Sequence, residues 1–391
     1  MFIVGIDIAK RSHEAVIINS DGQIVRKAFV FKNDLDGFKK LLSESEKLST
    51  NKSDFIFAME STSHYWLAVY SALLKQGFET KVINPIQSDA LRNLYIRQVK
   101  NDSHDSFIIA QVIRFGHYSE GSIQASEYFE LRELCRARSY IVDLCSDIKR
   151  KTICLLDQVF PEYETLFSDI FGVTSMEILK NCPLPEDILA IDTDKLTEMI
   201  SVASRKKFKK DKAEQIKSAA QNSFGIIIGI TSIKILLNGH IEHIKFMEQQ
   251  IADIDKQIVQ LYNTFDCKLT TIPGIGPVSA AIILSEIGDV SRFSSATKLA
   301  AFAGIDPTVK QSGEFNSSHN HMSKRGSPYL RRAIWQASVL AVMYEPNLKT
   351  FFEQKRSEGK PYMNAIGHVT RKLTNIIYAV LRDNKPYYLR Q

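Results

Sequence analysis

Residues 2–8 read FIVGIDI, an apolar strand pattern that carries one acidic residue, Asp7. A second apolar run, FIFAM at residues 55–59, ends directly before Glu60. A carboxylate among β-branched residues is unfavourable unless it is paired or bound to a metal ion. If the two strands are neighbours in one sheet, Asp7 and Glu60 converge. The pattern therefore indicates an acidic site on an α/β domain.

The segments around these two strands alternate between strand and helix patterns. Three strands are followed by helix, strand, helix, strand and helix, which predicts a mixed α/β domain over residues 1–125. Further strand patterns lie at 15–18, 24–31 and 80–83, the last stopped by Asn84-Pro85, and helical spacing occurs at 34–48, 64–76 and 102–115.

The chain after residue 125 has a helical character. Two long stretches of helical spacing run from Ser126 to Val159 and from about Ile235 to Phe265, with short helices at 165–235 between them. The long helices could pair as an antiparallel hairpin or serve as a dimer arm. We expect residues 126–265 to form a coiled-coil arm with a helical insert, and residues 266–391 to form a mostly helical C-terminal domain.

Composition and charge narrow the functional classes. A chain of 391 residues with 44% hydrophobic and 24% charged residues favours two or three globular domains and excludes a disordered or fibrous protein. Residues 320–391 hold 13 Lys and Arg against 4 Asp and Glu, a net charge of +9, whereas residues 1–319 carry a net charge of −3. This asymmetry indicates a polyanionic partner, although a solvated basic face explains it equally well.

Cysteine usage and hydropathy place the chain in the cytosol. The five cysteines show no CxxC spacing, so we expect reduced thiols rather than a disulfide framework or a zinc ribbon. The first residues lack the basic region and the long apolar run of a signal peptide. The most apolar later stretch, residues 225–237, is too short and too polar to span a membrane.

Two further acidic residues extend the N-terminal pattern. Asp102 and Asp105 lie three apart at the start of a helix, so they share one face. Together with Asp7 and Glu60 they supply hard oxygen ligands that suit Mg²⁺, and two such ions about 4 Å apart can clamp the reacting oxygens of a phosphodiester. Asp102 could instead be a helix N-cap, and Glu60 an ordinary loop carboxylate. The order of the four fits a ribonuclease-H-like nuclease fold.

The sequence IPGIGP at residues 272–277 predicts a helix–hairpin–helix. Gly274 and Gly276 would let the backbone approach a phosphate, and the following helix would offer its free N–H groups. Such a unit binds the nucleic-acid backbone without reading its sequence. The alternative is a tight turn between helices that binds no ligand.

A polar, basic stretch follows between residues 310 and 332. It reads KQSGE at 310–314, MSKRG at 322–326 and LRR at 330–332. Ser312 is a candidate nucleophile for phosphoryl transfer, although a lone serine is usually only a surface hydroxyl. His319 and His321 form at most a weak metal signal. We expect four cations of this stretch to contact the nucleic-acid backbone: Lys324, Arg325, Arg331 and Arg332.

In combination, these motifs resemble the DEDD-type insertion-sequence transposases of the IS110 group, which also includes the Piv-type DNA invertases. The resemblance implies a RuvC-like N-terminal domain, a coiled-coil arm and a C-terminal transposase domain. The segment at 165–235 is longer than the family's linker, and nothing is carried over to it. The matching segments are VGIDIAK, AMEST and KNDSHD near the N-terminus, and TIPGIGPVSAAIILSEIGDVSRF, KLAAFAGIDP, KQSGE and MSKRGSPYLRRAIWQAS near the C-terminus.

The resemblance also implies a chemistry. It implies that four acidic residues bind Mg²⁺: Asp7, Glu60, Asp102 and Asp105. The serine of the QSG segment, here Ser312, forms a covalent phosphoserine link to DNA. The family often reads SSGG where this chain reads QSGE, which makes Ser323 the second candidate. Members are guided by a noncoding bridge RNA and assemble as tetramers.

Three functions follow as hypotheses. The first is a recombinase that cuts and rejoins double-stranded DNA, with a bridge RNA and further copies of the chain, as a dimer or tetramer, for partners. The second is a RuvC-like nuclease that resolves branched DNA by metal-dependent hydrolysis. The third is a nucleic-acid scaffold with vestigial carboxylates, which the complete acidic set makes the weakest. Ser312 separates the first two, because hydrolysis needs only water and metal.

Overall fold

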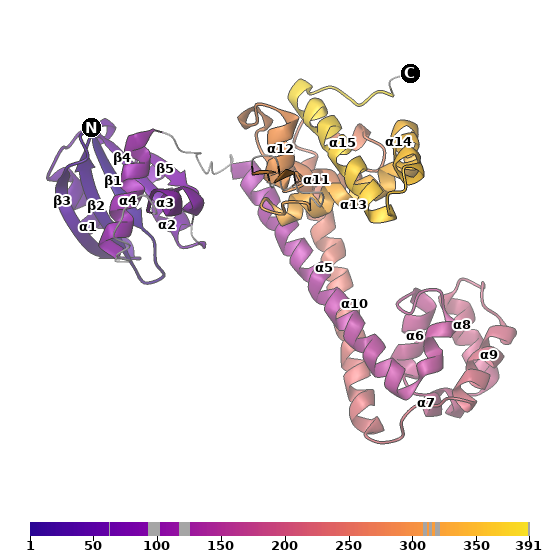
Figure 1. Ribbon diagram of the computed structural model, residues 1–391. Coiled ribbons are helices and arrows are strands. Elements are labelled where there is room, and N and C mark those ends of the chain that lie inside the picture. The colour runs from indigo at the N-terminus through magenta and orange to yellow at the C-terminus, as the bar shows by residue number, and fades with distance from the viewer. Residues whose placement is uncertain are drawn as a thin grey trace. The chain divides into compact units, whose positions relative to one another are not determined.

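The computed structural model describes residues 1–61, 63–92, 102–116, 126–307, 311–312, 315–316 and 321–389. The chain divides into two compact units, residues 1–124 and residues 125–391 (Figure 1). The first unit is α/β and the second is mostly helical, which confirms the predicted fold class. Within the described ranges, no helix is both long enough and apolar enough to cross a bilayer.

The first unit is built on a five-stranded sheet. The strand order is β3-β2-β1-β4-β5, with β1 antiparallel to β2 and parallel to β4. The condition for Asp7 and Glu60 to converge, that their two strands are neighbours, is therefore met, and the order is that of a ribonuclease-H-like sheet. The strands are β1 (Phe2–Asp7), β2 (Ser12–Asn19), β3 (Ile24–Lys32), β4 (Phe55–Glu60) and β5 (Glu79–Ile83).

Both faces of this sheet are covered, because apolar side chains alternate between them along β1 and β4. One face packs on α1 (Leu35–Glu46) and α2 (Trp66–Lys75). The other face packs on α4 (Asp102–Phe115). The sequence patterns missed α3 (Pro85–Arg92): Asn84-Pro85 ends the strand as predicted, but proline is also favoured at the first position of a helix.

In the second unit, α5 (Ser126–Val159) and α10 (Ile230–Tyr262) lie side by side (Figure 1). Arg138 of α5 pairs with Asp255 of α10. Lys149, which follows Arg138 on α5, pairs at 2.6 Å with Glu248, which precedes Asp255 on α10. These partners run in opposite directions, so the two helices form an antiparallel hairpin. A short 3-10 helix, η2 (Pro161–Leu166), follows α5.

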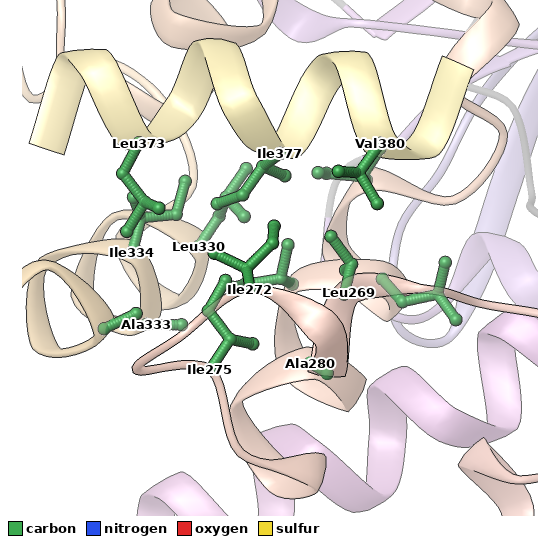
Figure 2. Packing of buried hydrophobic residues seen from close by; sticks show 14 of the residues in the cluster. Leu269, Ile272, Ile275, Ala280, Leu330, Ala333, Ile334, Leu373, Ile377 and Val380 are labelled. Carbon is green, nitrogen blue, oxygen red and sulfur yellow. The ribbon is translucent and has the colours of Figure 1, made fainter. Parts of the chain in front are cut away.

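The hairpin carries a separate apolar core at each end. At one end the core encloses α6 (Val173–Asn181), α7 (Pro185–Ala190), α8 (Thr193–Ala203) and α9 (Lys210–Gln221). At the other end lies the C-terminal core, formed by α11 (Pro277–Ile287), α12 (Ala296–Ala303), α13 (Pro328–Tyr344), α14 (Pro346–Ser357) and α15 (Tyr362–Asp383). Figure 2 shows Leu373, Ile377 and Val380 of α15 facing Leu330 and Ile334 of α13 and Ile272 of the 272–277 turn.

Candidate functional site

Two of the predicted acidic residues end neighbouring strands. Asp7 is the last residue of β1 and Glu60 is the last residue of β4. The parallel register pairs Ile6 with Met59, so Asp7 and Glu60 are the next residues along the two strands. Both are half-buried. Asp7 was predicted inside a strand reaching Ile8, but the strand ends at Asp7, so its charge is less desolvated than the apolar pattern suggested.

Helix α4 lies across one face of the sheet that carries Asp7 and Glu60. A side chain at Gly5 would meet the Ser106 carbonyl oxygen at 2.1 Å and the Ala110 nitrogen at 2.7 Å, so the helix backbone lies directly on β1. Ile113, near the other end of α4, lines one pocket with Met1 and Ile3, where β1 begins. The helix therefore runs opposite to β1, and its first turn points towards the end of β1 that carries Asp7.

That first turn contains the other two predicted acidic residues. The Asp105 side chain is 15% exposed, and its Oδ1 accepts a hydrogen bond from Arg92 Nε at 3.1 Å and forms an ion pair with Arg92 Nη2 at 3.0 Å. Arg92, the last residue of α3, also pairs with Asp89. Sequence reasoning missed Arg92, because an arginine 13 residues before Asp105 gives no periodic signal. Asp102 is the first residue of α4, and its side chain lies outside the described part of the structure.

The donor set suits a hard divalent cation. Asp7 and Glu60 supply carboxylate oxygens at one edge of the sheet, and Asp105 supplies a third from the first turn of α4. Among the described residues, no three acidic, histidine or cysteine side chains are close enough together to hold a metal ion. Arg92 occupies Oδ1 of Asp105, so a cation bound there would have to displace this guanidinium or use the other carboxylate oxygen.

The 272–277 turn separates the roles of its two glycines. Gly274 has a left-handed φ of +92°, and a side chain there would meet the Ala341 nitrogen of α13 at 2.5 Å. This glycine is needed for packing. Gly276 is the N-cap of α11, and nothing lies within 4 Å of the position that a side chain would take. Of the two, Gly276 has the open space that an approaching phosphate requires.

Two of the C-terminal motifs, KLAAFAGIDP and MSKRG, pack against each other. The Lys324 N–H donates to the Gly304 carbonyl at 3.1 Å, and the Ser327 N–H donates to the Phe302 carbonyl at 2.9 Å. A side chain at Gly326 would lie 1.8 Å from the Phe302 oxygen. Close backbone contact thus fixes the basic 322–327 loop against the end of α12.

The four predicted nucleic-acid-binding cations divide into two pairs. Lys324 and Arg325 are exposed on the 322–327 loop. Arg331 donates from Nη1 to the Ala303 carbonyl at 3.1 Å, which is a structural contact. Arg332 forms an ion pair with Asp143 of α5 at 2.7 Å, with both side chains about half exposed. Lys324 and Arg325 are therefore the better placed pair for a polyanion.

Of the two candidate serines, only Ser323 has a side chain within the described part of the structure. Ser312 belongs to β6 (Gln311–Ser312), which pairs with β7 (Phe315–Asn316), and its side chain lies outside the described residues. Ser323 donates its hydroxyl hydrogen bond to the half-buried carboxylate of Asp306. His319 lies outside the described ranges, and His321 is exposed.

Comparisons with known proteins agree with this arrangement. One family model, described as a transposase, matches residues 4–161, and the model of the IS116/IS110/IS902 transposase family matches residues 267–353. The 43.6 kDa protein of insertion element IS110 from Streptomyces coelicolor is 21% identical over 99% of this chain and 95% of its own length. This chain belongs to the IS110 family of transposases.

Two further likenesses accompany this membership. The pilin gene-inverting protein of Moraxella bovis is 33% identical over 153 residues, which cover 37% of this transposase and 48% of that protein. The RuvC structure of Thermus thermophilus matches with 14% identity over 31% of this chain and 99% of its own, at a TM-score of 0.22.

The matched regions correspond to the two candidate sites of the transposase. The first model contains the four acidic positions from Asp7 to Asp105, and the second contains Gly274, Ser312 and the basic residues up to Arg332. Residues 162–266 lie between the two models, and they include the segment at 165–235 to which the resemblance carried nothing over. The two family models thus match the two parts of the chain that hold these predicted positions.

Proposed function

We propose that this transposase cuts and rejoins DNA through a covalent phosphoserine intermediate, with Mg²⁺ held by Asp7, Glu60, Asp102 and Asp105. The observation that carries the metal part is the register of β1 and β4, which puts Asp7 beside Glu60 at the end of the sheet where the first turn of α4 points. Two bound ions would supply Lewis acid chemistry to the scissile phosphate.

Asp7→Ala tests the metal part. Strand cleavage in Mg²⁺ is expected to disappear, while the melting temperature and nucleic-acid binding stay close to wild type, because Asp7 is half-buried at a strand end. The matched control is Asp36→Ala, which removes a side chain that is 92% exposed on α1. Full cleavage by Asp7→Ala would contradict the proposed metal site.

The serine part of the proposal assigns the nucleophile to Ser312. Its hydroxyl would attack the scissile phosphorus, and the displaced strand end would later attack the phosphoserine and restore the phosphodiester without ATP. Support comes from the pairing of Pro307 with Met322, which connects the start of the loop that bears Ser312 to the basic 322–327 loop. Ser323 is less suited, because its hydroxyl is engaged by Asp306.

A denaturant-trapping experiment decides the serine part. Reactions stopped in hot detergent should contain a protein–DNA adduct with the wild type and none with Ser312→Ala. An adduct that persists in Ser312→Ala transfers the role to Ser323, which Ser323→Ala then checks. Cleaved ends without any adduct in the wild type would favour the hydrolytic nuclease instead.

We further propose that a noncoding bridge RNA guides the reaction and that a dimer or tetramer in the bacterial or archaeal nucleoid performs it. Support comes from the family membership and from the basic C-terminal segment. The gene is expressed together with its flanking DNA, and the protein is purified. Sequencing of the RNA that copurifies tests the guide, and mass photometry tests the oligomeric state. Recombination by an RNA-free monomer would exclude them.

A further inference from the structure

Three arginines gather at the end of α11, outside the sites described above. Arg132 and Arg136 are one turn apart on α5, so their side chains share a face. Arg292 lies in the 3-10 helix η4 (Val290–Arg292). Burial lowers the pKa of both Arg132 and Arg292; the charge of Arg136 lowers that of Arg132 further, and the charge of Arg132 lowers that of Arg292 further.

The Glu286 carboxylate is hydrogen-bonded to one of these arginines, and its charge also acts on the other two. This buried carboxylate accepts from Arg136, with Nε to Oε1 at 2.7 Å and Nη2 to Oε2 at 3.1 Å. The Ser327 hydroxyl donates to the same Oε2 at 2.8 Å. Both oxygens of Glu286 are therefore engaged, and a two-pronged contact of this kind commits Arg136 to a structural role.

Among the described residues, no carboxylate forms an ion pair with Arg132 or Arg292, and Arg292 donates from Nη2 to the Glu286 carbonyl at 3.5 Å. The Nε of Arg132 is a buried donor with no hydrogen-bond partner among the described residues. The other acids that act on these two arginines, Glu133 and Asp289, are exposed to solvent, and the Asp289 carboxylate already accepts from Ser291. A guanidinium cannot lose its proton, so an anion that reaches these two side chains is attracted to both charges.

The electrostatic state of the pair is unfavourable in the free protein. Partial burial lowers the pKa of Arg132, and the charge of Arg136 lowers it further. Partial burial and the charge of Arg132 likewise lower the pKa of Arg292. Both shifts mean that the charged forms are destabilised where they stand. An arrangement of this kind is typical of a binding site, where a ligand relieves the repulsion.

Each guanidinium lies over at least one aromatic ring. Stacking of this kind leaves the N–H edges available to donate, which is how arginine binds phosphate groups. The separations from guanidinium carbon to ring centre are 5.3 Å for Arg132 over Phe129, 4.9 Å for Arg136 over Tyr329, and 4.6 Å for Arg292 over both Phe293 and Phe302.

The arginine cluster is continuous with the basic 322–327 loop. Phe302, which supports Arg292, accepts a hydrogen bond from the Ser327 N–H, and the Ser327 hydroxyl binds Glu286 within the cluster. Lys324 and Arg325 are exposed on the same loop. A phosphate backbone lying on that loop therefore has the cluster as its next cationic contact.

We propose that Arg132 and Arg292 form a phosphate-binding site for a nucleic-acid backbone, with Arg136 and Glu286 as positioning residues. The ligand is a phosphodiester, which DNA and RNA share. Its identity as a nucleic acid rests on the proposed function, but the site does not require Ser312 chemistry or the metal. A transposase that formed no covalent adduct would still use it.

Binding measurements on the full chain test the site with two probes of one sequence, a DNA duplex from the element end and the corresponding RNA duplex. Arg132→Gln and Arg292→Gln are each expected to weaken binding about tenfold and to reduce the salt slope by about one. The control is Arg150→Gln, also on α5, whose side chain is 69% exposed and pairs with Asp147. A loss confined to one probe identifies the backbone that is bound, and no loss on either probe overturns the proposal.

Stability without nucleic acid separates binding from structure. Because Arg132 is repelled in the free protein, Arg132→Gln should leave the melting temperature unchanged or raise it. Inorganic pyrophosphate should raise the melting temperature of the wild type and have less effect on the variant. A fall of about 3 °C or more in the nucleic-acid-free variant would assign Arg132 a structural role and overturn the proposal, whatever its affinity.

Discussion

At the scale of single residues, Gly5 decides whether the acidic residues can converge. Gly5→Ala would push a methyl group into the backbone of α4, at 2.1 Å from the Ser106 oxygen. We expect a loss of about 2 kcal/mol or more in the free energy of unfolding, because helix backbone cannot move aside as a flexible side chain can. Chemical denaturation measures it, and DNA cleavage should fall as α4 shifts.

Gly239→Ala is the matched control for Gly5→Ala. Gly239 lies inside α10, and nothing is within 4 Å of the position that its side chain would take. The same chemical change should therefore stabilise the protein, by about 1 kcal/mol, through helix propensity. Equal effects of the two substitutions would contradict the assigned contact between α4 and β1.

His13 gives the first unit a pH-dependent stability. It is 1% exposed, and its Nδ1 accepts the Ala9 N–H at 3.2 Å. Burial lowers the pKa of His13 below the ordinary 6.5, and the nearby Asn33 side chain partly opposes this shift. The unfolded chain therefore takes up the proton first, so stability is complete above pH 6.5 and declines as the pH falls below it.

His13→Asn tests this pH dependence. Asparagine keeps an acceptor for the Ala9 N–H but does not titrate. Melting curves recorded between about pH 7.5 and pH 5.5 should show a smaller decline for the variant than for the wild type. An identical decline would assign the effect to other histidines.

At the scale of elements, Glu286 joins three helices. It lies in the last turn of α11, binds Arg136 of α5, and accepts from Ser327, which caps α13. Glu286→Gln should lower the free energy of unfolding by about 2 kcal/mol, less than for a fully buried pair because Arg136 is 40% exposed. The comparison is Glu248→Gln, whose pair with Lys149 is exposed and should contribute less than about 1 kcal/mol. Urea denaturation of both variants measures the difference.

At the scale of the whole molecule, the two units have separate cores and should unfold separately. Phe57→Ala removes a fully buried ring from the first unit. It should lower the free energy of unfolding of one calorimetric transition by about 3–5 kcal/mol. Ile334→Ala should lower the free energy of unfolding of the other transition by about 2–5 kcal/mol, because Ile334 is fully buried in the C-terminal core (Figure 2). A single transition that both substitutions move would show that the units unfold together.

Local sequence patterns predicted much of this architecture, because strand alternation and helical spacing are short-range properties. They predicted the strand that carries Asp7, helix α4 with both bounds, and the two long helices. They missed α3, since the proline that ends a strand also begins that helix. Motif order was sufficient for the family, because the quoted motifs at both ends of the chain fall within the two matched family models.

Only the tertiary structure decided which groups meet. The antiparallel pairing of α5 with α10, the contact of Arg92 with Asp105 and the packing role of Gly274 join residues far apart in the chain or depend on a neighbouring helix. The arginine cluster is the clearest case: Arg132 and Arg292 are separated by 160 positions and carry no shared motif. The sequence by itself determined the elements and the family, because these follow from local spacing and motif order. Long-range packing decided the charge balance at the end of α11, because burial and ion pairing exist only once the elements are assembled.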